Sequence, residues 1–95
     1  MSIEELVARY INSADHVWQT LDFAEQPATL SASDIRRVAE TAKAYLDDAR
    51  HFMGEQKFEV SLTAVAYCEG LLDALRLLGA VRFEWPSKVE QERKG

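Results

Sequence analysis

The sequence has too few cysteines for a disulfide-bonded protein and too few basic residues for a protein that binds nucleic acid or an anionic membrane. Its single cysteine, Cys68, leaves no internal disulfide possible, and it lies in an apolar run where a free thiol behaves as a small hydrophobic side chain. We therefore expect a protein of the reducing cytoplasm. The 11 basic residues are outnumbered by 16 acidic residues and form no stripe, so neither nucleic acid nor an anionic membrane surface is an expected partner.

Long apolar runs and targeting signals are also missing. The start of the chain, Ser2-Ile3-Glu4-Glu5, lacks the basic and apolar regions of a secretory signal. The longest apolar-rich segment, residues 60–81, is interrupted by polar and charged side chains, which argues against a membrane span. These interruptions are Ser61, Thr63, Glu69, Asp73 and Arg76. We expect a soluble chain without a membrane partner.

Catalytic patterns are equally scarce. The four glycines are scattered, so they form no glycine-rich phosphate loop. No serine or cysteine nucleophile has a histidine base at a suitable position. We therefore assign no catalytic residue and expect no cofactor, and an enzyme is the less favoured interpretation.

The sequence does contain clear helical periodicity. Apolar residues at steps of three and four predict helices over residues 3–21, 34–53 and 58–78. The segment between the first two helices, with Pro27, is predicted as a loop, and Ser31 or Ser33 as the cap of the second helix. The short connection after Gly54 makes the third helix fold back antiparallel on the second.

These elements predict an all-α fold, a three-helix up-down-up bundle whose second and third helices form an antiparallel hairpin. The length suits one domain, which we place at residues 1–81. Residues 82–95 are predicted to be a partly disordered tail. Within it, Phe83, Trp85 and Pro86 are expected to fold back over the end of the bundle.

The third helix is apolar on nearly every side, which predicts a central position between partners. Its leucines are too numerous for a groove between two helices, and each one left in water forgoes about 1.5 to 3 kcal/mol of burial. These are Leu71, Leu72, Leu75, Leu77 and Leu78. We therefore expect a homodimer or a protein partner; the alternative is a well-covered helix with one or two exposed leucines.

Two motifs in the hairpin resemble a known family. They are Tyr45-x-x-Asp48-Ala49-x-x-Phe52 and Tyr67-x-Glu69-Gly70-x-Leu72-Asp73-Ala74, the second followed by Gly79. Over residues 42–81 the chain is similar to the archaeal domain-of-unknown-function family 357. The resemblance implies a compact helical domain, attached in some archaeal proteins to a nucleotidyltransferase that resembles flavin-nucleotide synthases. The family has no established activity.

Small and charged residues of the third helix are the candidates for a site. A glycine inside a helix costs about 1 kcal/mol relative to alanine, so we expect close helix packing at Gly70 and Ala74. Glu69, Asp73 and Arg76 share one narrow arc and form the only polar stripe of this helix. The full set of candidates for a polar network or ligand patch is Tyr45, Asp48, Tyr67, Glu69, Asp73 and Arg76.

Three hypotheses account for these candidates. In a structural network, Asp48 and Glu69 accept hydrogen bonds from tyrosine, threonine or backbone donors, and Arg76 pairs with Asp73. In a ligand patch, the acids line a pocket. A metal centre is disfavoured, because Asp48 is expected about 9 Å along the helix axis from Glu69 and the sequence has no Glu-x-x-His pair; no metal ligand is assigned.

We therefore expect an uncharacterised helical domain that acts as a structural or protein-interaction module, either self-associating or docking on a partner. The alternative is an accessory domain for a small ligand that uses Glu69, Asp73 and Arg76. The resemblance to a family that is attached in some proteins to a nucleotidyltransferase implies a nucleotide-related role for such a domain.

Overall fold

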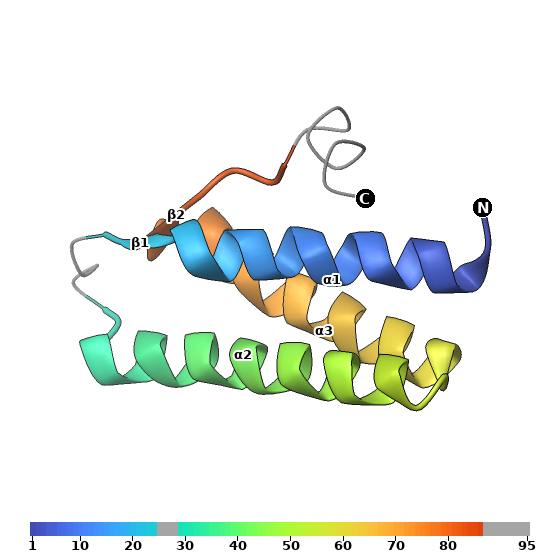
Figure 1. Cartoon of the computed structure of the whole chain (residues 1–95). Helices are drawn as coiled ribbons and strands as arrows, with labels where there is room; N and C mark the ends of the chain where they lie inside the picture. The colour runs from blue at the N-terminus through green and yellow to red at the C-terminus, as the bar shows by residue number, and fades with distance from the viewer. Residues whose placement is uncertain (25–28, 87–95) are drawn as a thin grey trace.

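The computed structural model describes residues 1–24 and 29–86, and it shows an all-α bundle in which three helices run up, down and up (Figure 1). Helix α1 spans Ile3–Thr20, α2 spans Ala32–Gly54 and α3 spans Phe58–Leu77. Two short strands, β1 at Asp22–Phe23 and β2 at Val81–Arg82, join the ends of α1 and α3. The predicted fold class is therefore confirmed.

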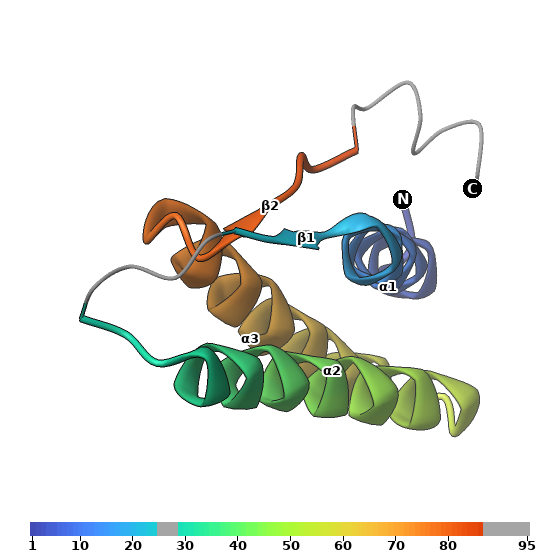
Figure 2. The same cartoon turned by 90° about the vertical axis from the view of Figure 1, so that its left-hand side faces the viewer.

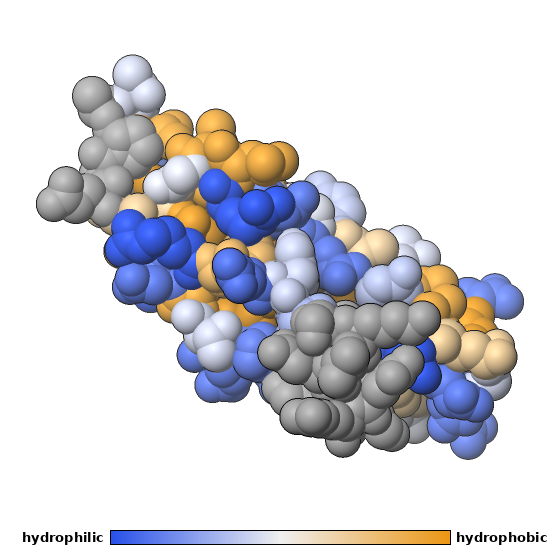
Figure 3. Space-filling view, turned by 90° about the horizontal axis from the view of Figure 1, so that it is seen from above, coloured by the Kyte–Doolittle hydropathy of each residue, from blue (hydrophilic) through white to orange (hydrophobic). Residues whose placement is uncertain are grey.

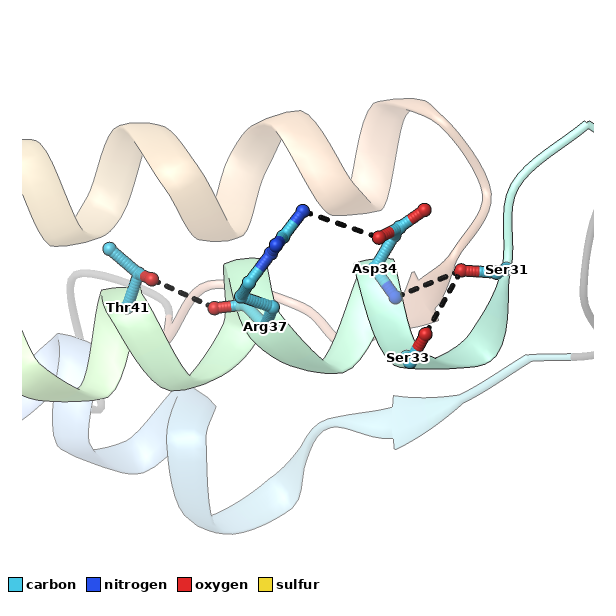
Figure 4. Close-up of polar contacts among 5 residues, drawn as sticks. All are labelled: Ser31, Ser33, Asp34, Arg37 and Thr41. Atoms are coloured by element: carbon cyan, nitrogen blue, oxygen red, sulfur yellow. Dashed lines mark hydrogen bonds and ion pairs between the residues drawn. The ribbon is translucent and has the colours of Figure 1, made fainter.

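Serine caps set the starts of the first two helices. The Ser2 hydroxyl accepts a hydrogen bond from the Glu5 amide at 3.1 Å and thereby caps α1. Ser31 does the same for α2, accepting from the Asp34 amide at 3.1 Å beside the Ser33 hydroxyl (Figure 4). Because Ser31 is the cap, α2 begins at Ala32, earlier than the start at residue 34 that we predicted.

Helix α3 packs against both α1 and α2 and has the most extensive contacts of the three helices, chiefly with α2 (Figure 2). The core between the helices consists mainly of small and medium-sized side chains, which allow close approach of the backbones. The largest fully buried hydrophobic residues are Val7, Val17, Leu46, Val65, Leu72 and Val81. Two serines are buried with them, Ser13 of α1 and Ser61 of α3, and the Ser61 hydroxyl donates a hydrogen bond to the carbonyl of Ala49 in α2.

A small antiparallel ribbon closes one end of the bundle (Figure 2). Asp22 lies opposite Arg82 and Phe23 opposite Val81, and the Arg82 guanidinium contacts the Asp22 carboxylate at 2.9 Å. The expectation of a plain loop after α1 is therefore wrong at residues 22 and 23. Two-residue strands have no periodicity to recognise, and their partner lies about 60 residues away along the chain.

Beyond β2, the chain returns over the bundle as far as residue 86. Phe83 and Trp85 contact each other edge to face, with ring centroids 5.0 Å apart, and both pack against the core. The back-folding expected for these two residues is therefore observed. Residues 87–95, the rest of the predicted tail, lie outside the described residues.

The described helices include none that is long and apolar enough to span a membrane. Seen from above, hydrophobic surface gathers toward both ends of the elongated bundle, with hydrophilic residues between them (Figure 3).

Candidate functional site

The polar stripe of α3 forms a cluster with the segment that follows β2. Asp73 accepts two hydrogen bonds from Arg76, at 3.0 Å from Nε and 2.8 Å from Nη2. It accepts a third from the Trp85 indole N–H at 3.2 Å. Hydrogen bonds from Arg76, and then from Trp85, lower the pKa of Asp73 below its ordinary value, so this carboxylate is charged at neutral pH.

Glu69 lies one turn before Asp73 in a different environment. Its side chain is half-buried, and burial, followed by the charge of Asp73, raises its pKa to about 7. Glu69, Gly70, Asp73 and Trp85 line a hollow on this side of α3. The group thus combines a permanently charged carboxylate with one that gains and loses a proton near neutral pH, which suits a cation or an amine better than a phosphate.

The other predicted site residues lie elsewhere. Tyr45 of α2 and Tyr67 of α3 stack on each other, with ring centroids 4.5 Å apart and planes inclined by 31°. Asp48 is exposed on α2, and among residues 1–24 and 29–86 it has no hydrogen bond or ion pair with Glu69. The structure therefore brings Glu69, Asp73 and Arg76 together, and pairs the two tyrosines, but does not join these two groups through Asp48.

Close helix packing at Gly70 and Ala74 is not observed within the chain. Both residues are exposed, and a Cβ atom added to Gly70 would have no neighbour within 4 Å. The prediction rested on the cost of a glycine inside a helix, which a closely packed neighbour usually offsets, whereas α1 and α2 leave the Gly70 side of α3 open. If Gly70 and Ala74 serve close packing, the packing partner therefore has to lie outside the part of the chain that the structure describes.

Along that open side runs a strip of residues without charged side chains, which we call the α3 face. Its members follow steps of three and four along five turns and carry no charge: Val60, Thr63, Tyr67, Gly70, Ala74 and Leu77. The Thr63 hydroxyl donates to the Glu59 carbonyl of its own helix at 3.0 Å. The hydroxyl group of Thr63 has thus already donated its hydrogen bond, so a partner that covers Thr63 would leave no donor unpaired.

The part of the chain described by the structure contains no group of three or more histidine, cysteine, aspartate or glutamate side chains that could hold a metal ion.

Two features of the surface could not be recognised from the sequence. The contribution of Trp85 to the Asp73 cluster depends on the ribbon, which had no recognisable signal. The α3 face did have a signal in its spacing, but the helix is apolar nearly all round, and periodicity alone does not distinguish its covered sides from its open side.

Comparison with known proteins relates most of the chain to one family. The model of a family described as "Protein of unknown function (DUF357)" matches residues 9–81. No curated protein and no solved structure matches the chain.

Proposed function

Since this chain belongs to the DUF357 family, whose function is unknown, we propose from its surface that it is a protein-interaction module that binds through the α3 face. The module carries no chemistry of its own in this proposal. Its role is to present a preformed helical surface to a second protein chain.

The observation that carries the proposal is the exposure of large apolar side chains on one helix. The exposed fractions are 47% for Val60, 56% for Tyr67, 74% for Leu77 and 61% for the neighbouring Leu78. Covering each such side chain yields about 1.5 to 3 kcal/mol. Scattered exposed leucines are ordinary, but an uncharged apolar strip along a whole helix is typical of an interaction surface.

The edge of α2 next to the α3 face extends the surface. Half-buried side chains follow it at helical spacing: Val38, Tyr45 and Phe52. The stack of Tyr45 on Tyr67 holds both rings in place before any partner arrives. Rigid aromatic anchors lose little conformational entropy on binding and are frequent in the centres of interfaces.

Leu77 offers a direct test, because its exposed side chain contributes little to the fold. We expect Leu77→Gln to keep the helical structure and to lose the bound partner, whether that partner is a second copy or another protein. The matched control is Ile3→Gln, which removes another exposed apolar residue, 41% exposed, from α1.

The measurement is affinity capture with tagged wild type, Leu77→Gln and Ile3→Gln as baits, with quantitative mass spectrometry of the retained chains. Untagged copies of this protein are included in the extract and counted. Retention by wild type and Ile3→Gln, but not by Leu77→Gln, supports the proposal. Equal retention by all three baits, or none by wild type, overturns it.

The second candidate is a small-ligand role for Glu69, Asp73 and Arg76, favoured by the hollow beside Trp85. Two observations weigh against a nucleotide there. The guanidinium of Arg76 is already bound to Asp73, and two neighbouring carboxyl groups disfavour a phosphate. A cationic or amine ligand fits the electrostatics better.

A further inference from the structure

We propose that the occupant of the α3 face is a second copy of this chain, packed with its α3 antiparallel across a two-fold axis that passes near Gly70. The inference rests on the proposed function and deepens it by naming the partner and its orientation. Three independent features of the described residues support it.

The first feature is the symmetry of the α3 face along the helix. Its residues form three pairs placed equally on either side of the midpoint between Cys68 and Glu69. The pairs are Val60 with Leu77, Thr63 with Ala74, and Tyr67 with Gly70. An antiparallel second copy would therefore set each member of a pair opposite the other member on the partner, as an isologous two-fold contact requires.

The second feature is the match of sizes at the centre of this arrangement. Tyr67 is the largest side chain of the α3 face and is 56% exposed, whereas Gly70 has no side chain and open space where a Cβ would be. The two-fold operation sets the tyrosine of each copy beside the glycine of the other. A glycine inside a helix costs about 1 kcal/mol relative to alanine. In the dimer Gly70 would make room for the partner's tyrosine, whereas no described residue of the isolated chain needs that space.

The third feature is charge complementarity on the edge of α2. The hydrogen bond from Ser61 to Ala49 and the stack of Tyr45 on Tyr67 fix the register of the hairpin. In this register, the midpoint between residues 42 and 43 of α2 lies level with the midpoint between residues 68 and 69 of α3.

Arg37 and Asp48 lie equally far from that level, about 8 Å to either side at 1.5 Å rise per residue. Both are exposed on the edge of α2 beside the α3 face, and the Arg37 side chain is 80% exposed. Figure 4 shows Arg37 directed to the side of α2 on which α3 lies, with Asp34 as its neighbour at 3.3 Å. Asp48 has no ion-pair partner among residues 1–24 and 29–86.

The same two-fold axis therefore brings Arg37 of each copy toward Asp48 of the other, twice per dimer. If the partner were an unrelated protein, nothing would require Arg37 and Asp48 to lie equally far from the centre of the α3 face. Complementary charges at the rim of an interface fix its register and exclude wrong partners.

Charge exchange tests this arrangement. We expect Arg37→Glu and Asp48→Arg each to weaken the dimer about tenfold in sedimentation equilibrium, because each substitution sets two pairs of like charges across the axis. The double variant restores both pairs with reversed sign, so its dissociation constant should return close to that of wild type. Glu40→Arg is the control, since Glu40 is exposed on α2 and lies away from the edge that carries Asp48.

A second variant tests the centre of the interface. A Cβ atom at position 70 would meet no atom within 4 Å in the isolated chain, Gly70 is exposed, and leucine has a higher helix propensity than glycine, so we expect Gly70→Leu to fold. Gly70→Leu should still weaken the dimer at least as much as Arg37→Glu or Asp48→Arg, because the new leucine side chain occupies the space of the partner's tyrosine. Asn12→Leu, which adds a leucine to the exposed side of α1, should leave the dimer unchanged.

The outcomes separate this inference from the proposed function. Rescue by the double charge variant together with weakening by Gly70→Leu supports the antiparallel dimer. A dimer that is lost in Leu77→Gln but unaffected by the charge variants and by Gly70→Leu overturns the arrangement and keeps the α3 face. A wild type that stays monomeric at every concentration overturns the second copy as occupant, and the capture experiment then decides the proposed function alone.

Discussion

At the scale of single residues, the fold changes the acid chemistry of Glu69 strongly. Its side chain is half-buried beside the charged Asp73, and its pKa is raised to about 7 from 4.5. Between these two values the folded protein holds a proton that the unfolded chain has released. Such a proton stabilises the folded state at acidic pH, and the stabilisation is lost as the pH rises through about 7.

We therefore expect the unfolding free energy of wild type to fall between about pH 5 and pH 8, and Glu69→Gln to remove that part of the pH dependence. The measurement is urea denaturation at several pH values within this range. Glu59→Gln is the matched control, because Glu59 is an exposed glutamate of the same helix. Identical pH profiles for wild type and Glu69→Gln would contradict the assignment.

The sequence identified Glu69, Asp73 and Arg76 and the pairing of Arg76 with Asp73, but not the contact of Asp73 with Trp85. Glu69, Asp73 and Arg76 were grouped because helical spacing places them on one arc, and the structure keeps them together. Trp85 was not assigned to them, because its contact with Asp73 depends on the path of the chain after β2. Local spacing determines which residues share a helix face, whereas long-range folding determines what meets that face.

At the scale of elements, the end of α3 decides where the chain returns across the bundle. Gly79 has φ of +74°, and the Ala80 amide donates to the Leu75 carbonyl at 2.9 Å, which is the hydrogen bond of a Schellman cap. This turn directs Val81 and Arg82 into the ribbon with β1.

Gly79→Ala should therefore lower the unfolding free energy by about 1 kcal/mol, because a side chain is strained at positive φ. Gly54→Ala is the control: Gly54 ends α2 without a positive φ and has open space at its Cβ position. Thermal unfolding of both variants checks the prediction. A loss of stability in Gly54→Ala as large as in Gly79→Ala would contradict the role given to the backbone conformation.

The helices were predictable from the sequence and the ribbon was not. Periodic apolar residues and the Ser31 cap give long helices a signal that repeats every turn. The pairing of Phe23 with Val81 leaves no such pattern, since it consists of two residues on each side.

At the scale of the whole molecule, α3 is central but covered on only part of its circumference. The sequence predicted more leucines than two neighbouring helices could bury, but not which ones remain outside. In the structure Leu72 and Leu75 are buried, whereas Leu77 and Leu78 are exposed. The choice depends on which sides of α3 are covered by α1 and α2, and that is long-range information which no local pattern records.

The solution mass tests most directly whether two copies meet through the α3 face. Light scattering across a concentration series should give wild type a mass that approaches twice the 10.8 kDa of one chain, and Leu77→Gln a mass that stays near one chain at the same concentrations. A wild-type mass of one chain at all concentrations, or a dimer equally stable in Leu77→Gln, would contradict this account.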